Sequence, residues 1–195
     1  MKLTEYHDSA ARTLNMSLPS PTGIDSLIVY AAMGLAGEAG EFKKSVKDYL
    51  EYTKNDHYKK RLLTKVIEEL GDFNWHLVIL FRSIFASKDA QYLDTITTGP
   101  QWYCENDLFV VEDLLDTSLV LLELVKKAIY HKHEWNYDTV LELFKKLYNC
   151  SSNSAERLCG GMDPVLQTNI EKLMRRYPQG FTYTNSQNRT NEKHG

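Results

Sequence analysis

Two acidic pairs decide the fold of this chain: Glu-x-x-Glu in Gly34-Leu35-Ala36-Gly37-Glu38-Ala39-Gly40-Glu41, and Glu-x-x-Asp in Glu68-Glu69-Leu70-Gly71-Asp72. Apolar residues recur at helical spacing around both stretches, which predicts two long helices. Residues three apart on a helix point to the same side, so each pair presents two carboxylates on one face. The four carboxylates that meet when these helices pack side by side are those of Glu38, Glu41, Glu69 and Asp72.

Four carboxylates at one point repel one another, and burying them without partners costs several kcal/mol. A hard divalent cation relieves this repulsion, and an all-oxygen site suits Mg²⁺, Mn²⁺ or Ca²⁺. Glycines accompany both pairs, at Gly37, Gly40 and Gly71. Because a glycine inside a helix costs about 0.5–1 kcal/mol relative to alanine, we expect another helix or a ligand to approach closely there. The sequence therefore predicts a metal site between two helices.

Helical periodicity covers most of the chain, so we predict an all-α fold. Pro19, Pro21 and Gly23 mark a loop, and residues 86–106 are less regular. Asp163-Pro164 is a helix start, with aspartate at the cap and proline at the first position. The predicted helices cover residues 4–15, 25–52, 58–85, 107–133, 138–149 and 164–176, with a serine-rich turn and a short helix at 150–161.

The chain has the size and composition of one soluble globular domain. Its 195 residues are enough for a single core, and its hydrophobic content of 43% and charged content of 25% are ordinary for such a domain. A net charge of −3 gives no reason to expect bulk nucleic acid as a partner. We expect no membrane partner, because no window reaches the roughly 18 apolar residues of a membrane span. The N-terminus also lacks the apolar core of a signal peptide.

The three cysteines show no metal-binding spacing, which favours a reduced, cytoplasmic setting. We expect residues 1–181 to form one domain. Residues 182–195 lack apolar content, and we expect them to form a polar tail that is mobile without a ligand.

The two acidic pairs and the end of the chain together resemble a known family. The pairs at 38–41 and 69–72 and the segment 169–181 are similar to the signature helices and closing segment of MazG-like nucleoside triphosphate pyrophosphohydrolases. This all-α superfamily includes dimeric dUTPases and dCTP pyrophosphatases. The resemblance implies a four-helix-bundle-like core with additional short helices. It also implies a homodimer or homotetramer that hydrolyses a (deoxy)nucleoside triphosphate to the monophosphate and pyrophosphate, in housecleaning or nucleotide-pool control.

The resemblance also assigns roles to residues. It implies that the two acidic pairs hold Mg²⁺, with Mn²⁺ as an alternative. One of these acids, or the adjacent Glu68, takes the proton from the attacking water. Lys172, Arg176 and Tyr177 are expected to bind phosphates, and Asn169 to bond the sugar or a phosphate.

Two further substrate-binding candidates follow from position. Trp75, three residues past Asp72, lies on the metal side of its helix, where it either stacks on a base or packs in the core. Lys47 lies six residues beyond Glu41, and it reaches phosphates if the substrate extends along the helix.

We interpret the second half of the chain as a degenerate repeat of the first, because residues 125–133 resemble what usually follows the Glu-x-x-Glu helix in the family. In this alignment no Mg²⁺ site remains in the second half. The positions equivalent to the four acids are Thr117, Val120, Leu143 and Lys146.

Two alternative functions stay open. One is a non-catalytic protein of the same fold that binds a nucleotide or a partner. The other is a ferritin-like di-metal carboxylate protein, which needs a Glu-x-x-His motif. His76 follows Glu69 by seven residues and Asp72 by four, so the spacing disfavours the second alternative.

Overall fold

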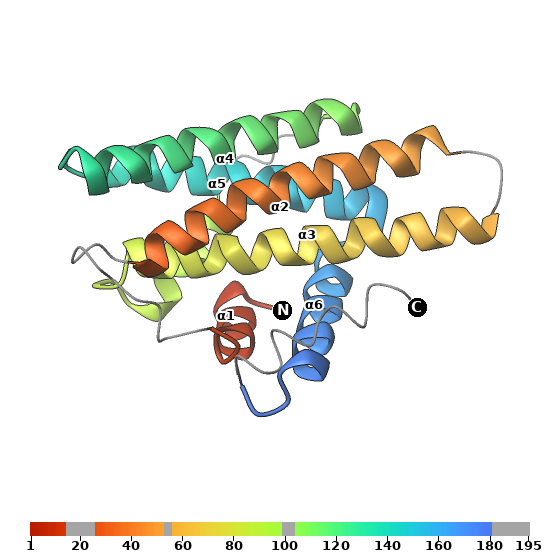
Figure 1. Cartoon of the computed structure of the whole chain (residues 1–195), viewed down its shortest axis with the longest axis horizontal. Helices are drawn as coiled ribbons and strands as arrows, with labels where there is room; N and C mark the ends of the chain where they lie inside the picture. Colours follow the sequence, from red (N-terminus) through yellow and green to blue (C-terminus); the bar gives the residue numbers. More distant parts are fainter. Residues whose placement is uncertain (15–25, 53–55, 99–103, 181–195) are drawn as a thin grey trace.

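The computed structural model describes residues 1–14, 26–52, 56–98 and 104–180, which are predominantly helical (Figure 1). The all-α prediction is confirmed. In chain order the elements are α1 (Leu3–Ala11), α2 (Ser26–Glu51), α3 (Asp56–Ile84), the 3₁₀-helix η1 (Ala90–Thr97), α4 (Asp107–Tyr130), α5 (Tyr137–Ser154), the π-helical turn η2 (Ala155–Cys159) and α6 (Met162–Arg176).

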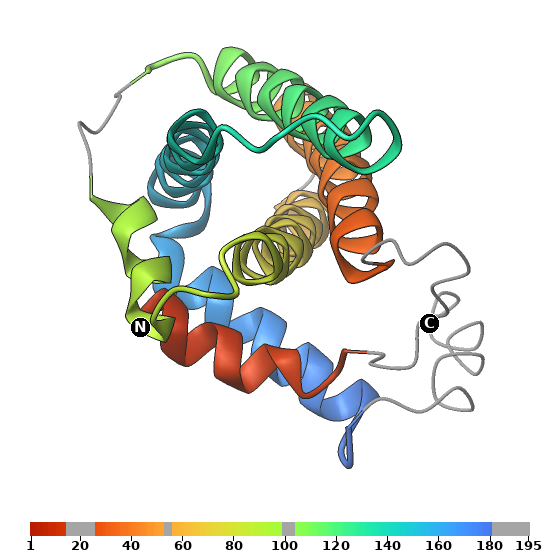
Figure 2. The same ribbon diagram turned by 90° about the vertical axis from the view of Figure 1, so that its left-hand side faces the viewer.

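Four long helices, α2 to α5, lie side by side along the longest axis of the molecule (Figures 1 and 2). α2 packs against α3 and α4, and α4 packs against α5. α3 is enclosed by its neighbours, and every residue from Phe73 to Phe81 is buried. A helix that is apolar all round is buried all round. This stretch contains no Asp, Glu, Lys or Arg, which explains its place in the middle of the end-on view in Figure 2.

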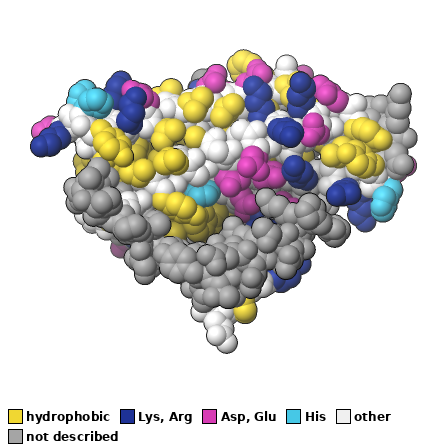
Figure 3. Space-filling view, viewed as in Figure 1, with side chains coloured by type: hydrophobic (Ala, Val, Ile, Leu, Met, Phe, Trp, Pro, Cys, Tyr) yellow, Lys and Arg dark blue, Asp and Glu magenta, His cyan; other side chains and the backbone are white. Residues whose placement is uncertain are grey.

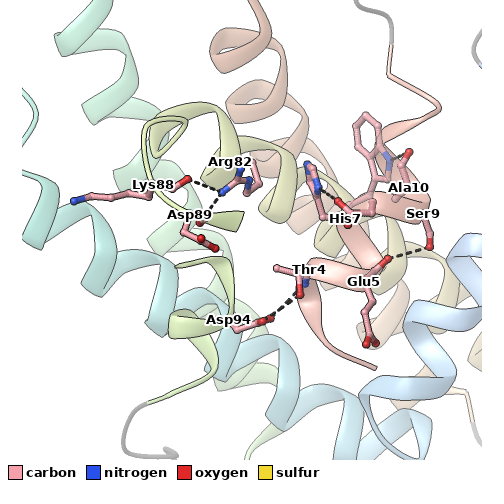
Figure 4. Close-up of polar contacts among 11 residues, drawn as sticks. Thr4, Glu5, His7, Ser9, Ala10, Arg82, Lys88, Asp89 and Asp94 are labelled. Atoms are coloured by element: carbon pink, nitrogen blue, oxygen red, sulfur yellow. Dashed lines mark hydrogen bonds and ion pairs between the residues drawn. The ribbon is translucent and has the colours of Figure 1, made fainter. Parts of the chain in front are cut away.

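The short helices α1 and α6 lie across one side of α3 (Figure 2). α1 buries Tyr6 and Ala10, which lie one turn apart on the same face. Thr4 anchors the start of this helix, because its backbone N–H and its hydroxyl both donate to the Asp94 carboxylate, at 3.3 and 3.1 Å (Figure 4). The buried face of α1 is turned toward α3 and α6.

α5 is longer than predicted, because its serines are satisfied inside the molecule. The helix continues to Ser154 and leads through η2 toward α6, where the sequence predicts a turn and a short helix. Ser151 is buried, and it exchanges hydrogen bonds with the Asn74 side chain of α3 at 2.8 and 3.1 Å. A serine with a partner across the core does not end a helix, although its residue type favours turns.

The other boundaries differ by a few residues. α1 ends at Ala11 and not at residue 15, and η1 gives regular structure to part of the stretch predicted as irregular. α6 starts at Met162 with Gly161 at the cap position, so Asp163 lies in the first turn. The predicted loop at 17–23 and the tail at 182–195 lie outside the described residues. The described helices include none with the length and apolar content needed to span a membrane.

Candidate metal centre

The acidic pairs of α2 and α3 meet along the middle of the two helices. Carboxylate oxygens of Glu38, Glu41 and Glu69 lie within 4.8 Å of one another. Glu38 and Glu69 are half-buried, whereas Glu41 is exposed. Figure 3 shows acidic side chains (magenta) gathered on the face over α2 and α3. Of the four acids predicted to converge, these three do so, with one side open to solvent. Asp72 is not a member of this group.

The register of the two helices follows from close packing at a glycine. A Cβ atom on Gly34 would lie 2.1–2.5 Å from ring atoms of His76, so only glycine allows this ring to lie against α2. Glu38 is one turn from Gly34, and Asp72 is one turn from His76. Because the helices run antiparallel, this contact places Glu38 and Asp72 opposite each other, and their charges interact.

Two side chains of α6 bond the Asp72 carboxylate, and one side chain of α1 supports them. Lys172 donates to Asp72 Oδ2, and Asn169 Nδ2 donates to Oδ1 at 2.8 Å. Tyr6 in turn donates its hydroxyl to Asn169 Oδ1 at 2.7 Å. Gly71 allows Asn169 to approach, because a Cβ atom there would lie 2.8 Å from Asn169 Cβ. Asn169 and Lys172 are only 1% and 5% exposed, so they fix the orientation of this carboxylate with little competition from water.

Burial and mutual repulsion make ionisation of Glu38 and Glu69 less favourable. Burial raises the pKa of Glu38 to about 8, and the charges of Asp72, Glu41 and Glu69 add to the rise. Burial also raises the pKa of Glu69, with further contributions from Glu41 and Asp72. Lys172 opposes both shifts. Without a cation, Glu38 therefore holds a proton near neutral pH.

The donor set fits a hard divalent cation. The converging atoms are carboxylate oxygens, which are the protein ligands that Mg²⁺ and Mn²⁺ prefer. When all four acids are ionised they carry four negative charges, and the single positive charge of Lys172 leaves three without a counter-charge at this point. A divalent ion would supply the missing positive charge. Glu38, Glu41 and Glu69 are the residues whose oxygens lie close enough together to hold it, and Asp72 lies beside them with its oxygens bonded to Asn169 and Lys172.

Two of the predicted substrate-binding residues lie away from the carboxylates. Lys47 is nine residues from Glu38 and therefore on the opposite face of α2, where its Nζ lies 3.7 Å from Glu51. Trp75 is 8% exposed, and its indole N–H donates to the Ala10 carbonyl at 3.4 Å. Its ring meets that of Tyr30 edge-on at 6.3 Å, so it belongs to the packing between α1, α2 and α3.

The remaining predicted residues lie beside the cluster or at the end of α6. Glu68 is half-buried and one position around α3 from Glu69. Arg176 is half-buried at the last position of α6. Tyr177 is 1% exposed and caps this helix, since its backbone N–H donates to the Leu173 carbonyl at 2.9 Å. Asn169 and Lys172 of α6 contact Asp72 directly.

The second helical hairpin, α4 with α5, carries different chemistry at the positions aligned with the acids. Thr117 is buried and Val120 is half exposed. Lys146 pairs with Asp113 at 2.6 Å. The degenerate repeat itself stays a prediction.

Sequence reasoning missed Tyr6 as a site residue. The side chain is fully buried where α1 packs against α3 and α6. The available signal was its hydroxyl, because a buried tyrosine hydroxyl usually finds a hydrogen-bond partner. That partner, Asn169, lies 163 residues further along the chain, so local spacing does not reveal it.

Comparison of the chain with known proteins yields no match: no protein-family model, no curated protein and no solved structure matches it significantly. The resemblance to MazG-like enzymes therefore stays a prediction from the motifs, and any inference about activity rests on the carboxylate cluster and its surroundings.

Proposed function

We propose that the protein hydrolyses a (deoxy)nucleoside triphosphate to the monophosphate and pyrophosphate, with Mg²⁺ bound by the two acidic pairs. The observation that carries this proposal is the convergence of Glu38, Glu41 and Glu69 within 4.8 Å, beside an Asp72 that other helices hold in place. A triphosphate is a polyanion and is repelled by such a cluster unless a cation lies between them. The site thus favours substrates that arrive together with divalent ions.

The reaction replaces one phosphoanhydride bond. Oxygen of a water molecule bonds to the α-phosphorus, the bond from that phosphorus to the α–β bridging oxygen breaks, and pyrophosphate leaves with the bridging oxygen. Bound Mg²⁺ would neutralise phosphate charge and favour deprotonation of a water molecule. A carboxylate beside the site, one of the four acids or Glu68, takes the proton of the attacking water.

The protein's own contribution is positioning. Asn169 and Lys172 orient the Asp72 carboxylate from one side, and Tyr6 orients Asn169. Glu38 gives up its proton when positive charge enters the site, because the same charges that raise its pKa are then compensated. A carboxylate that is already held in place needs little rearrangement during the reaction. Such preorganisation is a large contribution to catalysis in polar active sites.

Pyrophosphate release from a panel of nucleoside triphosphates with Mg²⁺ tests the proposal. We expect Glu38→Gln and Asp72→Asn each to abolish turnover while circular dichroism retains the wild-type helix content. Glu142→Gln is the matched control, because Glu142 is exposed on α5 and pairs with Lys145 at 2.8 Å, and it should keep full activity. Full activity in either site variant would remove the assignment.

The same panel separates the alternatives. Nucleotide binding without pyrophosphate release would indicate a non-catalytic protein, and oxygen-dependent absorbance after loading with Fe²⁺ would indicate a di-iron protein. Base and sugar preference emerge from the rates across the panel. The proposed homodimer or homotetramer is tested by light scattering during size-exclusion chromatography.

A further inference from the structure

The carboxylate site separates two parts of the α2–α3 pair that differ in charge. Toward the start of α2, residues 26–37 of α2 and 73–81 of α3 contain no Asp, Glu, Lys or Arg. Toward the turn between the helices, basic residues are frequent on both. They are Lys43, Lys44 and Lys47 of α2 and Lys59, Lys60, Arg61 and Lys65 of α3. In Figure 3, Lys and Arg side chains (dark blue) lie between the acidic patch and the right-hand end, where α2 and α3 join in Figure 1.

Two of these lysines, Lys44 and Lys65, lie next to the carboxylates. Lys44 is three residues beyond Glu41, and Lys65 is four residues before Glu69, so they are about 4.5 and 6 Å further along their helix axes. Both side chains are exposed.

Two nearby lysines are engaged elsewhere. Lys43 lies 3.1 Å from Glu112 of α4, and Lys47 is paired with Glu51 on the far face of α2. Within the described ranges, neither Lys44 nor Lys65 has a carboxylate within ion-pair distance. Two exposed ammonium groups are therefore available beside the acidic cluster.

The antiparallel register puts Lys44 and Lys65 on the same part of the hairpin. The helices are in contact at Gly34 and His76 on one side of the site. Near the turn they are in contact again, because the Tyr52 and Tyr58 rings lie 4.4 Å apart. Lys44 and Lys65 lie between these two contacts, one on each helix, so they flank the same stretch of surface.

We propose that Lys44 and Lys65 form the subsite for the terminal phosphates of the substrate, so that the leaving pyrophosphate points toward the α2–α3 turn. This inference rests on the proposed function. Pyrophosphate carries several negative charges that need cations, and lysine is a common phosphate ligand. On the other side of the carboxylates, residues 26–37 of α2 and 73–81 of α3 include no Lys or Arg, so this part of the hairpin is suited to the less charged nucleoside. Lys172, on α6, is engaged by Asp72.

Isothermal titration with inorganic pyrophosphate in the presence of Mg²⁺ tests the subsite. We expect Lys44→Gln and Lys65→Gln each to weaken pyrophosphate binding about tenfold, as the loss of one charged hydrogen bond predicts. Binding of the nucleoside monophosphate should be unchanged. Lys47→Gln removes the same charge about one turn further from the carboxylates, from a lysine that is paired with Glu51, and should bind pyrophosphate like the wild type. The subsite is wrong if both site variants bind pyrophosphate normally, if Lys47→Gln weakens binding equally, or if only Arg176→Gln weakens it.

Turnover of triphosphates by the wild type, measured in parallel, keeps the two proposals apart. Turnover combined with lysine-independent pyrophosphate binding overturns the subsite alone. Pyrophosphate binding that needs Lys44 and Lys65 in a protein without turnover supports an anion subsite and overturns the proposed hydrolysis.

Discussion

At the scale of single residues, Asp72 and Glu38 share one site but differ in how their charge is balanced. Asp72 accepts hydrogen bonds from Asn169 and Lys172. Glu38 instead faces other carboxylates, and burial together with their charges raises its pKa to about 8. The first acid is therefore held in one orientation, and the second responds to protons and cations.

Tyr6→Phe should weaken the hold on Asp72. The variant loses the hydroxyl that bonds Asn169 Oδ1 at 2.7 Å and the Gly71 carbonyl at 3.1 Å. Leaving the buried Asn169 Oδ1 without this donor is expected to lower the free energy of unfolding by about 1–3 kcal/mol and to reduce turnover. Urea unfolding and steady-state kinetics measure both effects. Tyr52→Phe, which changes an exposed ring, is the control. Equal losses of stability and turnover in the two variants would contradict the role of Tyr6 in holding Asp72 through Asn169.

Glu38 should make the stability of the metal-free protein depend on pH. Burial raises its pKa from the ordinary 4.5 to about 8 in the folded state, so between these pH values the folded protein keeps a proton that the unfolded chain has lost. The free energy of unfolding therefore falls as the pH rises through this window, by about 1–3 kcal/mol when solvent screening is allowed for. Urea unfolding in EDTA at several pH values measures the slope. We expect Glu38→Gln to flatten it, and an unchanged slope in that variant would remove this explanation.

At the scale of elements, the α2–α3 hairpin is the part that sequence predicts best. Its apolar periodicity gives both helices, and the three-residue spacing of the acids places each pair on one face. Helical periodicity also places Lys47, nine residues from Glu38, on the opposite face of α2, where it lies beside Glu51. What local spacing does not give is the contact from α1 and α6, because Tyr6 and Asn169 are 163 residues apart.

Substitution by alanine should change stability in opposite directions at two glycines of α2. A Cβ atom at Gly34 would overlap the His76 ring, so Gly34→Ala pushes α2 and α3 apart and is expected to cost about 1–3 kcal/mol of stability, together with activity. A Cβ atom at Gly37 meets nothing within 4 Å, so Gly37→Ala should stabilise the helix by about 0.5–1 kcal/mol. Thermal unfolding compares the two variants. A stable, active Gly34→Ala protein would show that the His76 contact does not set the register.

At the scale of the whole molecule, the all-α class and the approximate positions of the long helices follow from the sequence. The crossing of α1 and α6 over α3 does not, because it depends on which buried polar groups find partners across the core. Ser151 illustrates this: its residue type favours a turn, but its bond to Asn74 keeps α5 continuous. Periodicity therefore does not predict which distant residue pairs with a buried polar side chain.

The Lys172–Asp72 ion pair has a consequence for the stability of the metal-free protein. A built-in ammonium group partly offsets the acidic repulsion, so docking of α6 onto α3 does not have to wait for a metal. Small zinc domains behave differently, since they unfold when a chelator strips them. Here we expect a chelator to abolish turnover without unfolding the protein. Adding Mg²⁺ back should restore turnover at once, with no refolding step.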